Sequence, residues 1–170
     1  MKLKYFLYLL SIIIGVATVI FFLKKVNMSK ELSFTIVPAT IQEADFIDNQ
    51  LAEYMNVQVP FTQKENLILK NYVIKDRGKI VAGIKADIYY WKILYIEVLY
   101  LEPNYRGKGL GSALLEKVEQ EARSIGVTLV HLNTFDFQAK DFYLKHGYEI
   151  FGTLDDCPPG HKRYYMKKKL

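Results

Sequence analysis

The chain has 170 residues, of which 51% are hydrophobic and 24% charged, and this length and composition are typical of a globular protein with one hydrophobic core. Its formal net charge is +5, but four of the 23 basic residues flank an N-terminal apolar run, and without them 19 basic residues face 18 acidic ones. The composition therefore excludes a strongly basic nucleic-acid-binding surface, and the single cysteine, Cys157, excludes an internal disulfide.

The first 27 residues contain an apolar run, Tyr5–Leu23, with no charged side chain. A helix of this run would be about 28 Å long, which is enough to span a bilayer. The run is too long for the core of a cleaved signal peptide. Lysines flank both of its ends, so the charge pattern does not set an orientation. We predict a transmembrane anchor in residues 1–27, with the alternative that Met28 is the true start of the protein.

The next segment, residues 32–63, is expected to form a strand, a helix and a loop. The strand is predicted at Leu32–Val37, where Pro38 closes it. A capping-box pattern at Thr40 and Glu43 predicts a helix from about Ile41 to Asn56, followed by a loop. The side chains expected to pack inward from this helix are Ile41, Ala44, Ile47, Leu51, Tyr54 and Met55.

The hydrophobic pattern of the remaining chain predicts further strands and two helices. Asp76–Lys79 has the pattern of a hairpin turn, with Gly78 where positive φ is needed. The helix that ends at Gly126 has an apolar stripe and a polar side that includes Glu119. Because this helix crosses over, the strands before and after it should be parallel. The expected strands are Leu67–Lys75, Ile80–Tyr90, Ile93–Leu101, Thr128–Thr134, Tyr148–Leu154 and Arg163–Lys169, and the helices are Leu110–Ile125 and Gln138–His146.

The loop Arg106–Gly111 precedes the first of these two helices and carries three alternate glycines. Unpaired N–H groups and the positive end of the helix dipole attract a phosphate at such a position. A Walker loop would need Lys-Ser/Thr around its last glycine, where this chain has Leu110 and Ser112. A dinucleotide fingerprint needs G-x-G-x-x-G and an acidic residue after the next strand, which here closes on Asn133. The sequence therefore matches neither the Walker loop nor the dinucleotide fingerprint.

The pattern R-x-x-G-x-G from Arg106 to Gly111 instead resembles the pyrophosphate-binding motif of the GNAT superfamily of acyl-CoA N-acyltransferases. A second segment, Ala139-x-x-x-Tyr143-x-x-x-Gly147-Tyr148, is similar to the family segment that carries a catalytic tyrosine. The resemblance covers about residues 34–170. It implies an α/β fold of the α+β type, in which helices flank a mixed, mostly antiparallel central sheet of about seven strands, and an N-acetyltransferase domain at residues 32–170.

The resemblance also implies acetyl-CoA as the co-substrate and assigns site residues. Tyr143 matches the tyrosine that donates a proton to the CoA sulfur. Glu97 is the candidate base, since a carboxylate within an apolar strand is costly unless it is paired or used, and strand alternation would place it on the face of Tyr95, Leu99 and Leu101. His131 is a second candidate base. The expected CoA-binding residues are Leu99, Tyr100, Leu101, Arg106, Gly107, Lys108, Gly109, Leu110, Gly111, Ser112 and Asn133.

Two features of the sequence limit this assignment. The family often has asparagine three residues before the alanine of the second motif, and this chain has Asp136 there, so a pantetheine contact from that position is in doubt. The histidines His131, His146 and His161 are scattered, so no metal site is predicted.

The expected function is transfer of an acetyl group from acetyl-CoA to a primary amine of a small molecule or a protein. A membrane-anchored acyl-CoA sensor without turnover is the alternative. The identity of the acceptor and a homodimeric state remain open.

Because acetyl-CoA is cytosolic and Cys157 is unpaired, the domain is expected to face the cytoplasm, anchored through residues 5–23. Membrane fractionation of the full-length protein tests the anchor. Recovery in the membrane fraction is expected, whereas recovery wholly in the soluble fraction would contradict it and favour a start at Met28.

Overall fold

The computed structural model describes residues 34–170. The predicted anchor lies outside the described residues. Between residues 34 and 170, no helix has both the length and the hydrophobicity needed to cross a membrane. The chain divides after Asn49 into two units, and the second, Gln50–Leu170, contains the whole sheet.

Helix α2 (Ile41–Gln58) begins at the predicted capping box. The Thr40 hydroxyl accepts a hydrogen bond from the Glu43 N–H, and the Glu43 carboxylate accepts one from the Thr40 N–H at 2.7 Å. The Thr40 N–H and the Thr40 hydroxyl, at 2.8 Å, both donate to this carboxylate and lower the pKa of Glu43. The predicted start of the helix and its capping box are therefore both confirmed.

The strand prediction for this region is wrong. Residues 34–40 form no strand, and no strand of the described residues pairs with them. The inward packing of α2 stays a prediction, because this helix crosses the boundary between the two units and its residues up to Asn49 belong to the first of them.

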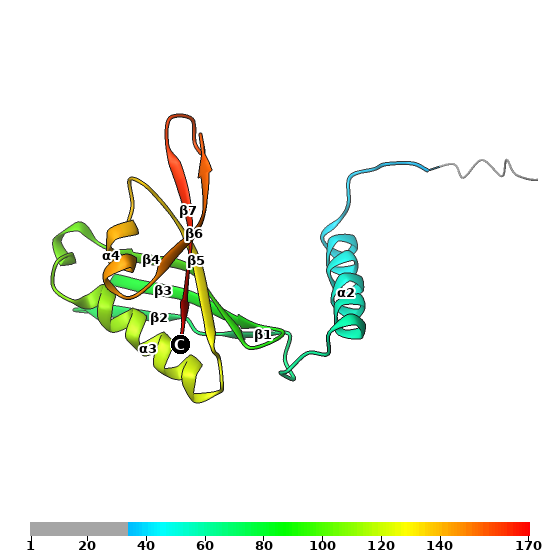
Figure 1. The fold of residues 1–170 in the computed structure, drawn as a ribbon, viewed down its shortest axis with the longest axis horizontal. Helices are drawn as coiled ribbons and strands as arrows, with labels where there is room; N and C mark the ends of the chain where they lie inside the picture. The colour runs from blue at the N-terminus through cyan, green and yellow to red at the C-terminus, as the bar shows by residue number, and fades with distance from the viewer. Residues whose placement is uncertain (1–33) are drawn as a thin grey trace, which may run out of the picture. The chain divides into compact units, whose positions relative to one another are not determined.

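Seven strands form one mixed sheet in the order β1-β3-β4-β5-β7-β6, with β2 also paired to β3 (Figure 1). As predicted, β4 and β5 are parallel, and the other pairs are antiparallel. The strands are β1 (Leu67–Leu69), β2 (Tyr72–Asp76), β3 (Lys79–Tyr89), β4 (Ile93–Leu101), β5 (Leu129–Phe135), β6 (Glu149–Asp155) and β7 (Lys162–Lys169).

The predicted strand Leu67–Lys75 is divided into β1 and β2. At the break, the side chain of Asn71 accepts a hydrogen bond from the Ala86 N–H, while the Lys70 N–H donates to the Ala86 carbonyl. A side chain thus replaces one bond of the backbone ladder. The hairpin turn that follows is as predicted, with positive φ at Arg77 and Gly78.

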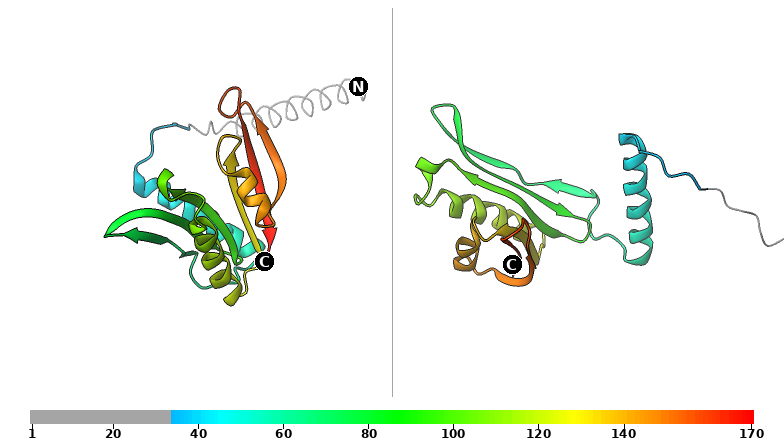
Figure 2. Two further views of the ribbon diagram at one scale, coloured as in Figure 1. Left: turned by 90° about the vertical axis from the view of Figure 1, so that its left-hand side faces the viewer. Right: turned by 90° about the horizontal axis from the view of Figure 1, so that it is seen from above.

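Helices α3 (Leu110–Ser124) and α4 (Lys140–Lys145) lie on the same face of the sheet (Figure 2). A short 3-10 helix, η1 (Pro103–Tyr105), joins β4 to the glycine loop. The core lies between α3 and the sheet, and its fully buried side chains include Ile84, Ile88, Leu94, Ile96, Leu115, Val118, Leu132 and Met166. The opposite face of β3, β4 and β5 is called the open face below; it carries Lys85, Asp87, Tyr89, Tyr95, His131 and Asn133, which alternate with core residues.

Glu119 is only 4% exposed, although the sequence pattern placed it on the polar side of α3. Lys168 binds both of its carboxylate oxygens, at 2.9 and 2.7 Å, and Tyr148 donates to one of them. Arg123 adds an i,i+4 ion pair at 3.1 Å. This carboxylate is buried because three donors neutralise and solvate it.

Candidate active site

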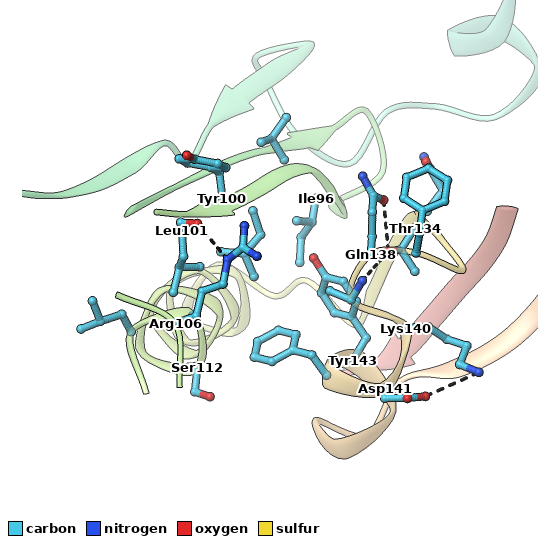
Figure 3. Close-up of a pocket in the computed structure, with 18 of the residues that line it drawn as sticks. Ile96, Tyr100, Leu101, Arg106, Ser112, Thr134, Gln138, Lys140, Asp141 and Tyr143 are labelled. Atoms are coloured by element: carbon cyan, nitrogen blue, oxygen red, sulfur yellow. Dashed lines mark hydrogen bonds and ion pairs between the residues drawn. The ribbon is translucent and has the colours of Figure 1, made fainter. Parts of the chain in front are cut away.

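A cavity of about 820 Å³ opens where β4 and β5 diverge, beside the start of α3 (Figure 3). The two strands pair only from Ile93 and Leu129 to Ile96 and Leu132. Beyond that point each strand continues without the other. The cavity is lined by Ile96–Leu101, Arg106, Gly107, Gly109–Ser112, Asn133, Thr134 and Asp136–Tyr143. It therefore brings together the predicted site residues except Lys108 and His131, the second candidate base.

The N-terminus of α3 has no side-chain cap. Gly109 is the N-cap and has φ of 79°, a left-handed conformation that favours glycine, and Gly107 has φ of 71°. The first intrahelical bond runs from the Ala113 N–H to the Gly109 carbonyl. The N–H groups of Leu110, Gly111 and Ser112 therefore have no partner within the helix and are available to an anion.

The two basic residues of the loop differ in position. Arg106 lines the cavity, and its Nε donates to the Leu101 carbonyl at 3.2 Å, which leaves its two terminal nitrogens for another acceptor. Lys108 does not line the cavity; its ammonium lies 5.1 Å from the centre of the Tyr105 ring. Of the two, only Arg106 is placed to touch a group in the cavity.

Ser112 is held by a histidine that the sequence analysis considered only as a metal ligand. Its hydroxyl lies 2.9 Å from His146 Nε2, while His146 Nδ1 lies 2.8 Å from the Phe142 carbonyl. Because a carbonyl only accepts, Nδ1 carries a proton, and in the neutral ring Nε2 accepts from Ser112. Helix α4 thereby fixes the start of α3.

A bulge in β4 lies at the point where the strands diverge. Ala86 pairs with Ile96 and Lys85 with Val98, so Glu97 is the extra residue. The bulge changes the alternation: Leu99 and Leu101 pack against the core with Ile96. The prediction that Glu97 shares their face is therefore wrong, because an inserted residue reverses the phase of the strand.

Glu97 lines the cavity and is paired. Its Oε2 lies 2.8 Å from Lys85 Nζ on β3, and its side chain is 48% exposed. Within residues 34–170, Oε1 has no hydrogen-bond partner. The carboxylate is thus fixed at the divergence of the strands with one oxygen available.

Tyr143 is 5% exposed and points from α4 toward Ile96 on β4 (Figure 3). Phe142 and Tyr148 pack edge-on against its ring, with centroids 5.1 and 5.4 Å away. Burial raises the pKa of Tyr143 to about 12. The hydroxyl therefore keeps its proton at neutral pH and can act as a donor in the cavity.

The end of β5 is more constrained than the sequence suggested. The amide of Asn133 donates to the Tyr95 hydroxyl and accepts from Arg163 Nε, both at 2.9 Å. Asp136 binds His161 at 3.1 Å and the Lys162 N–H at 3.2 Å. Desolvation opposes ionisation of Asp136, but these hydrogen bonds lower its pKa. Both side chains therefore have structural partners already.

Gln138 was not predicted, although it lines the cavity. Its side-chain oxygen accepts from the Phe135 N–H at 2.9 Å and from the Thr134 hydroxyl at 3.3 Å. These bonds fix the turn from β5 into α4 and hence the position of Tyr143. Gln138 lies one residue before Ala139 of the second motif, which is the only sequence signal that marks it.

His131, the second candidate base, lies on the open face and outside the cavity lining. Its Nε2 lies 2.8 Å from the Tyr89 hydroxyl, and its ring packs on Tyr95 with centroids 4.9 Å apart. Burial lowers the pKa of His131, so the ring is neutral at neutral pH. It is separated from Tyr143 by the sheet.

Comparison with known proteins agrees with this geometry. The model of the acetyltransferase (GNAT) family matches residues 39–148, more than half of the chain. Blasticidin-S acetyltransferase of Streptomyces morookaense is 32% identical over 104 residues, which cover 61% of this chain and 76% of that protein.

Solved structures share the fold. An acetyltransferase from Bacillus cereus ATCC 14579 has 32% sequence identity and a TM-score of 0.72, covering 81% of this chain and 98% of that one. An acetyltransferase from Bacillus anthracis str. Ames in complex with acetyl coenzyme A has 23% identity and a TM-score of 0.53, covering 65% and 66%. The chain is therefore a member of the GNAT family of acetyltransferases and has the α+β fold of that family.

Proposed function

We propose that this protein transfers the acetyl group of acetyl-CoA to a primary amine of a small molecule. The observation that carries the proposal is the cavity between the diverging strands, where a phosphate-binding helix start, an unpaired strand edge and a buried tyrosine hydroxyl converge. The family assignment and the acetyl-CoA complex of the Bacillus anthracis protein support it.

The residues present fit an acyl-CoA. The N–H groups of Leu110, Gly111 and Ser112, with the Arg106 guanidinium, would hold the pyrophosphate. The edge of β4 from Glu97 to Leu101 lacks a strand partner on the β5 side, so its main chain can bind the amide groups of pantetheine as a strand would. When bound, acetyl-CoA supplies an activated acetyl thioester.

The reaction joins the amine nitrogen to the acetyl carbon and breaks the carbon–sulfur bond. One proton leaves the nitrogen and one reaches the sulfur. We assign Glu97 Oε1 as the acceptor of the proton that leaves the amine, because Glu97 lies where the strands diverge. We assign Tyr143 as the hydrogen-bond donor to the sulfur, because its hydroxyl is protonated and lies within the cavity.

The raised pKa limits what Tyr143 does. A thiol has a pKa near 8.5, so a phenol with a pKa of about 12 would transfer its proton uphill by roughly 5 kcal/mol. The main contribution of Tyr143 is therefore a hydrogen bond to the charge that develops on sulfur. The proton that reaches the sulfur then comes from solvent, because a thiol with a pKa near 8.5 is protonated at neutral pH.

A small-molecule acceptor is supported by the relative from Streptomyces morookaense, which is named for a small antibiotic. The described cavity admits acetyl-CoA from the side of α3, so the acceptor would approach from the open face, where Glu97 is about half exposed. The two substrates would then approach from opposite sides of the point where β4 and β5 diverge.

The first prediction concerns CoA binding. Arg106→Ala should weaken CoA by roughly 10- to 150-fold, because a charged hydrogen bond to phosphate contributes about 1.5–3 kcal/mol. Lys108→Ala is the matched control, since Lys108 does not line the cavity, and it should change affinity by less than about threefold. Calorimetry measures both. Equal affinities for the two variants would contradict the placement of the pyrophosphate.

The second prediction concerns Tyr143. Tyr143→Phe should lower kcat by on the order of 10²-fold with little change in CoA affinity, because it removes one donor to the developing charge. Between about pH 6 and pH 9 the wild-type kcat should show no decline caused by Tyr143, since its hydroxyl stays protonated there. A declining basic limb that disappears in Tyr143→Phe would show that this group ionises in the range and would refute the assignment.

A further inference from the structure

The hydrogen bond between His146 and Ser112 links an ionisable side chain to the edge of the cavity. Ser112 lines the cavity (Figure 3) and is the third residue of α3, so its hydroxyl lies in the same turn as the N–H groups that are free to bind an anion. His146 does not line the cavity; it is partly buried, and its ring packs on Phe142, with centroids 4.3 Å apart. Acetyl transfer as proposed uses neither the Ser112 hydroxyl nor the imidazole.

The His146 ring is held at both of its nitrogens. Nδ1 lies 2.8 Å from the Phe142 carbonyl, and Nε2 lies 2.9 Å from Ser112 Oγ. Because the carbonyl keeps a proton on Nδ1, a second proton can enter the ring only at Nε2. Nε2 accepts from the Ser112 hydroxyl in the neutral ring, whereas in the charged ring it donates to Ser112 Oγ. The charge of His146 therefore sets the direction of this hydrogen bond.

The direction of the bond decides what the Ser112 hydroxyl can offer to a phosphate. A serine hydroxyl has one hydrogen to donate. While that hydrogen points to neutral His146, none is left for a phosphate oxygen. When His146 is charged, Ser112 Oγ accepts from the ring and its own hydrogen is free to turn to the phosphate. The phosphate then gains a donor in addition to the N–H groups, and the charge at the end of the chain strengthens it.

The positive groups at the site favour the neutral ring when no anion is bound. The Arg106 guanidinium lines the same cavity and has its terminal nitrogens free, and the positive end of the α3 dipole lies at Ser112. A third positive charge on His146 would be repelled by both. A bound pyrophosphate reverses this balance, because its negative charge attracts the proton as well as the guanidinium.

No carboxylate of residues 34–170 forms an ion pair with His146, so the protein itself supplies no anion for the charged ring. Glu116 accepts from Gln120 at 3.0 Å, and Glu149 pairs with Lys167 at 3.5 Å. The ionisable side chains within about one helical turn in sequence of either residue of the pair, or packed against Gly147, are Lys108, Glu116, Tyr143, Lys145, Tyr148, Glu149 and Lys168.

We infer that His146 is a positioning residue for the pyrophosphate of CoA: it acts through the Ser112 hydroxyl, and CoA binding draws a proton from solvent onto Nε2. This inference rests on the proposed binding of acetyl-CoA at the start of α3. The complex holds the proton more tightly than the free protein, so the added affinity is complete at low pH. It is lost as the pH rises through the range in which the imidazole of the complex titrates, within about pH 5 to 8.

Calorimetry of CoA binding to the full-length protein at about pH 6 and about pH 8 tests this, with each titration repeated in two buffers of different ionisation enthalpy to count protons. The phosphate monoester of CoA itself titrates near about pH 6, so the measure is the difference between wild type and His146→Gln. From the higher pH to the lower, wild type should gain on the order of fivefold more affinity than the variant, because a charge-assisted hydrogen bond is lost in the variant. Wild type should also take up more protons.

Two further variants separate the hydrogen-bond chain from a general effect of histidine. Ser112→Ala should remove the same part of the pH dependence, because the hydroxyl is the link between the ring and the phosphate. His131→Gln is the matched control, since His131 lies on the open face and outside the cavity lining, and it should behave as wild type.

Equal proton uptake by wild type and His146→Gln, or an unchanged pH dependence in Ser112→Ala, would overturn the inference and leave CoA binding standing. Absence of CoA binding to wild type at either pH would overturn the proposed function as well. If His146→Gln does not fold, NMR titration of the three imidazoles of wild type decides, with two of them assigned through His131→Gln and His161→Gln. His146 should stay protonated to higher pH with CoA than without it, and the same titration in both states would overturn the inference.

Discussion

The end of hydrogen bonding between β4 and β5 after Ile96 and Leu132 is the constraint on which the site depends. Two parallel strands that stop pairing leave main-chain groups without a strand partner inside the sheet, and these groups bind side chains, water or a ligand instead. The bulge at Glu97 occurs at the same place and turns the strand so that Leu99 and Leu101 keep the core filled. The edge of β4 is therefore accessible at the bulge, while the core beneath it stays packed.

The parts around this opening are held by contacts between elements distant in sequence. His146, the C-cap of α4, fixes Ser112 at the start of α3, and Gln138 fixes the turn that leads to Tyr143. The buried Glu119 ties α3 to β7 through Lys168. The start of α3, the unpaired edge of β4 and Tyr143 are therefore held in place by contacts within the fold, as a preorganised site requires.

The sequence predicted what depends on local pattern. The glycine loop, the apolar stripe of α3 and the crossover to β5 follow from spacing and periodicity, and the structure places this loop beside the cavity. Tyr143, in contrast, was expected only from the resemblance of the second motif to the family. The bulge could not be predicted, because one inserted residue leaves no compositional signature, and it reversed the expected face of Glu97 relative to Leu99. The burial of Glu119 depends on Lys168, 49 residues away.

The central claim is that the cavity performs acetyl transfer to an amine. The most direct measurement incubates full-length protein with acetyl-CoA and a panel of primary amines, and quantifies the free CoA thiol and the N-acetylated amine by mass spectrometry in the same sample. Our account predicts that the two products form in equal amounts and only when an acceptor amine is present. Thiol release at the same rate without an amine, or CoA binding without any N-acetylated product, would contradict it.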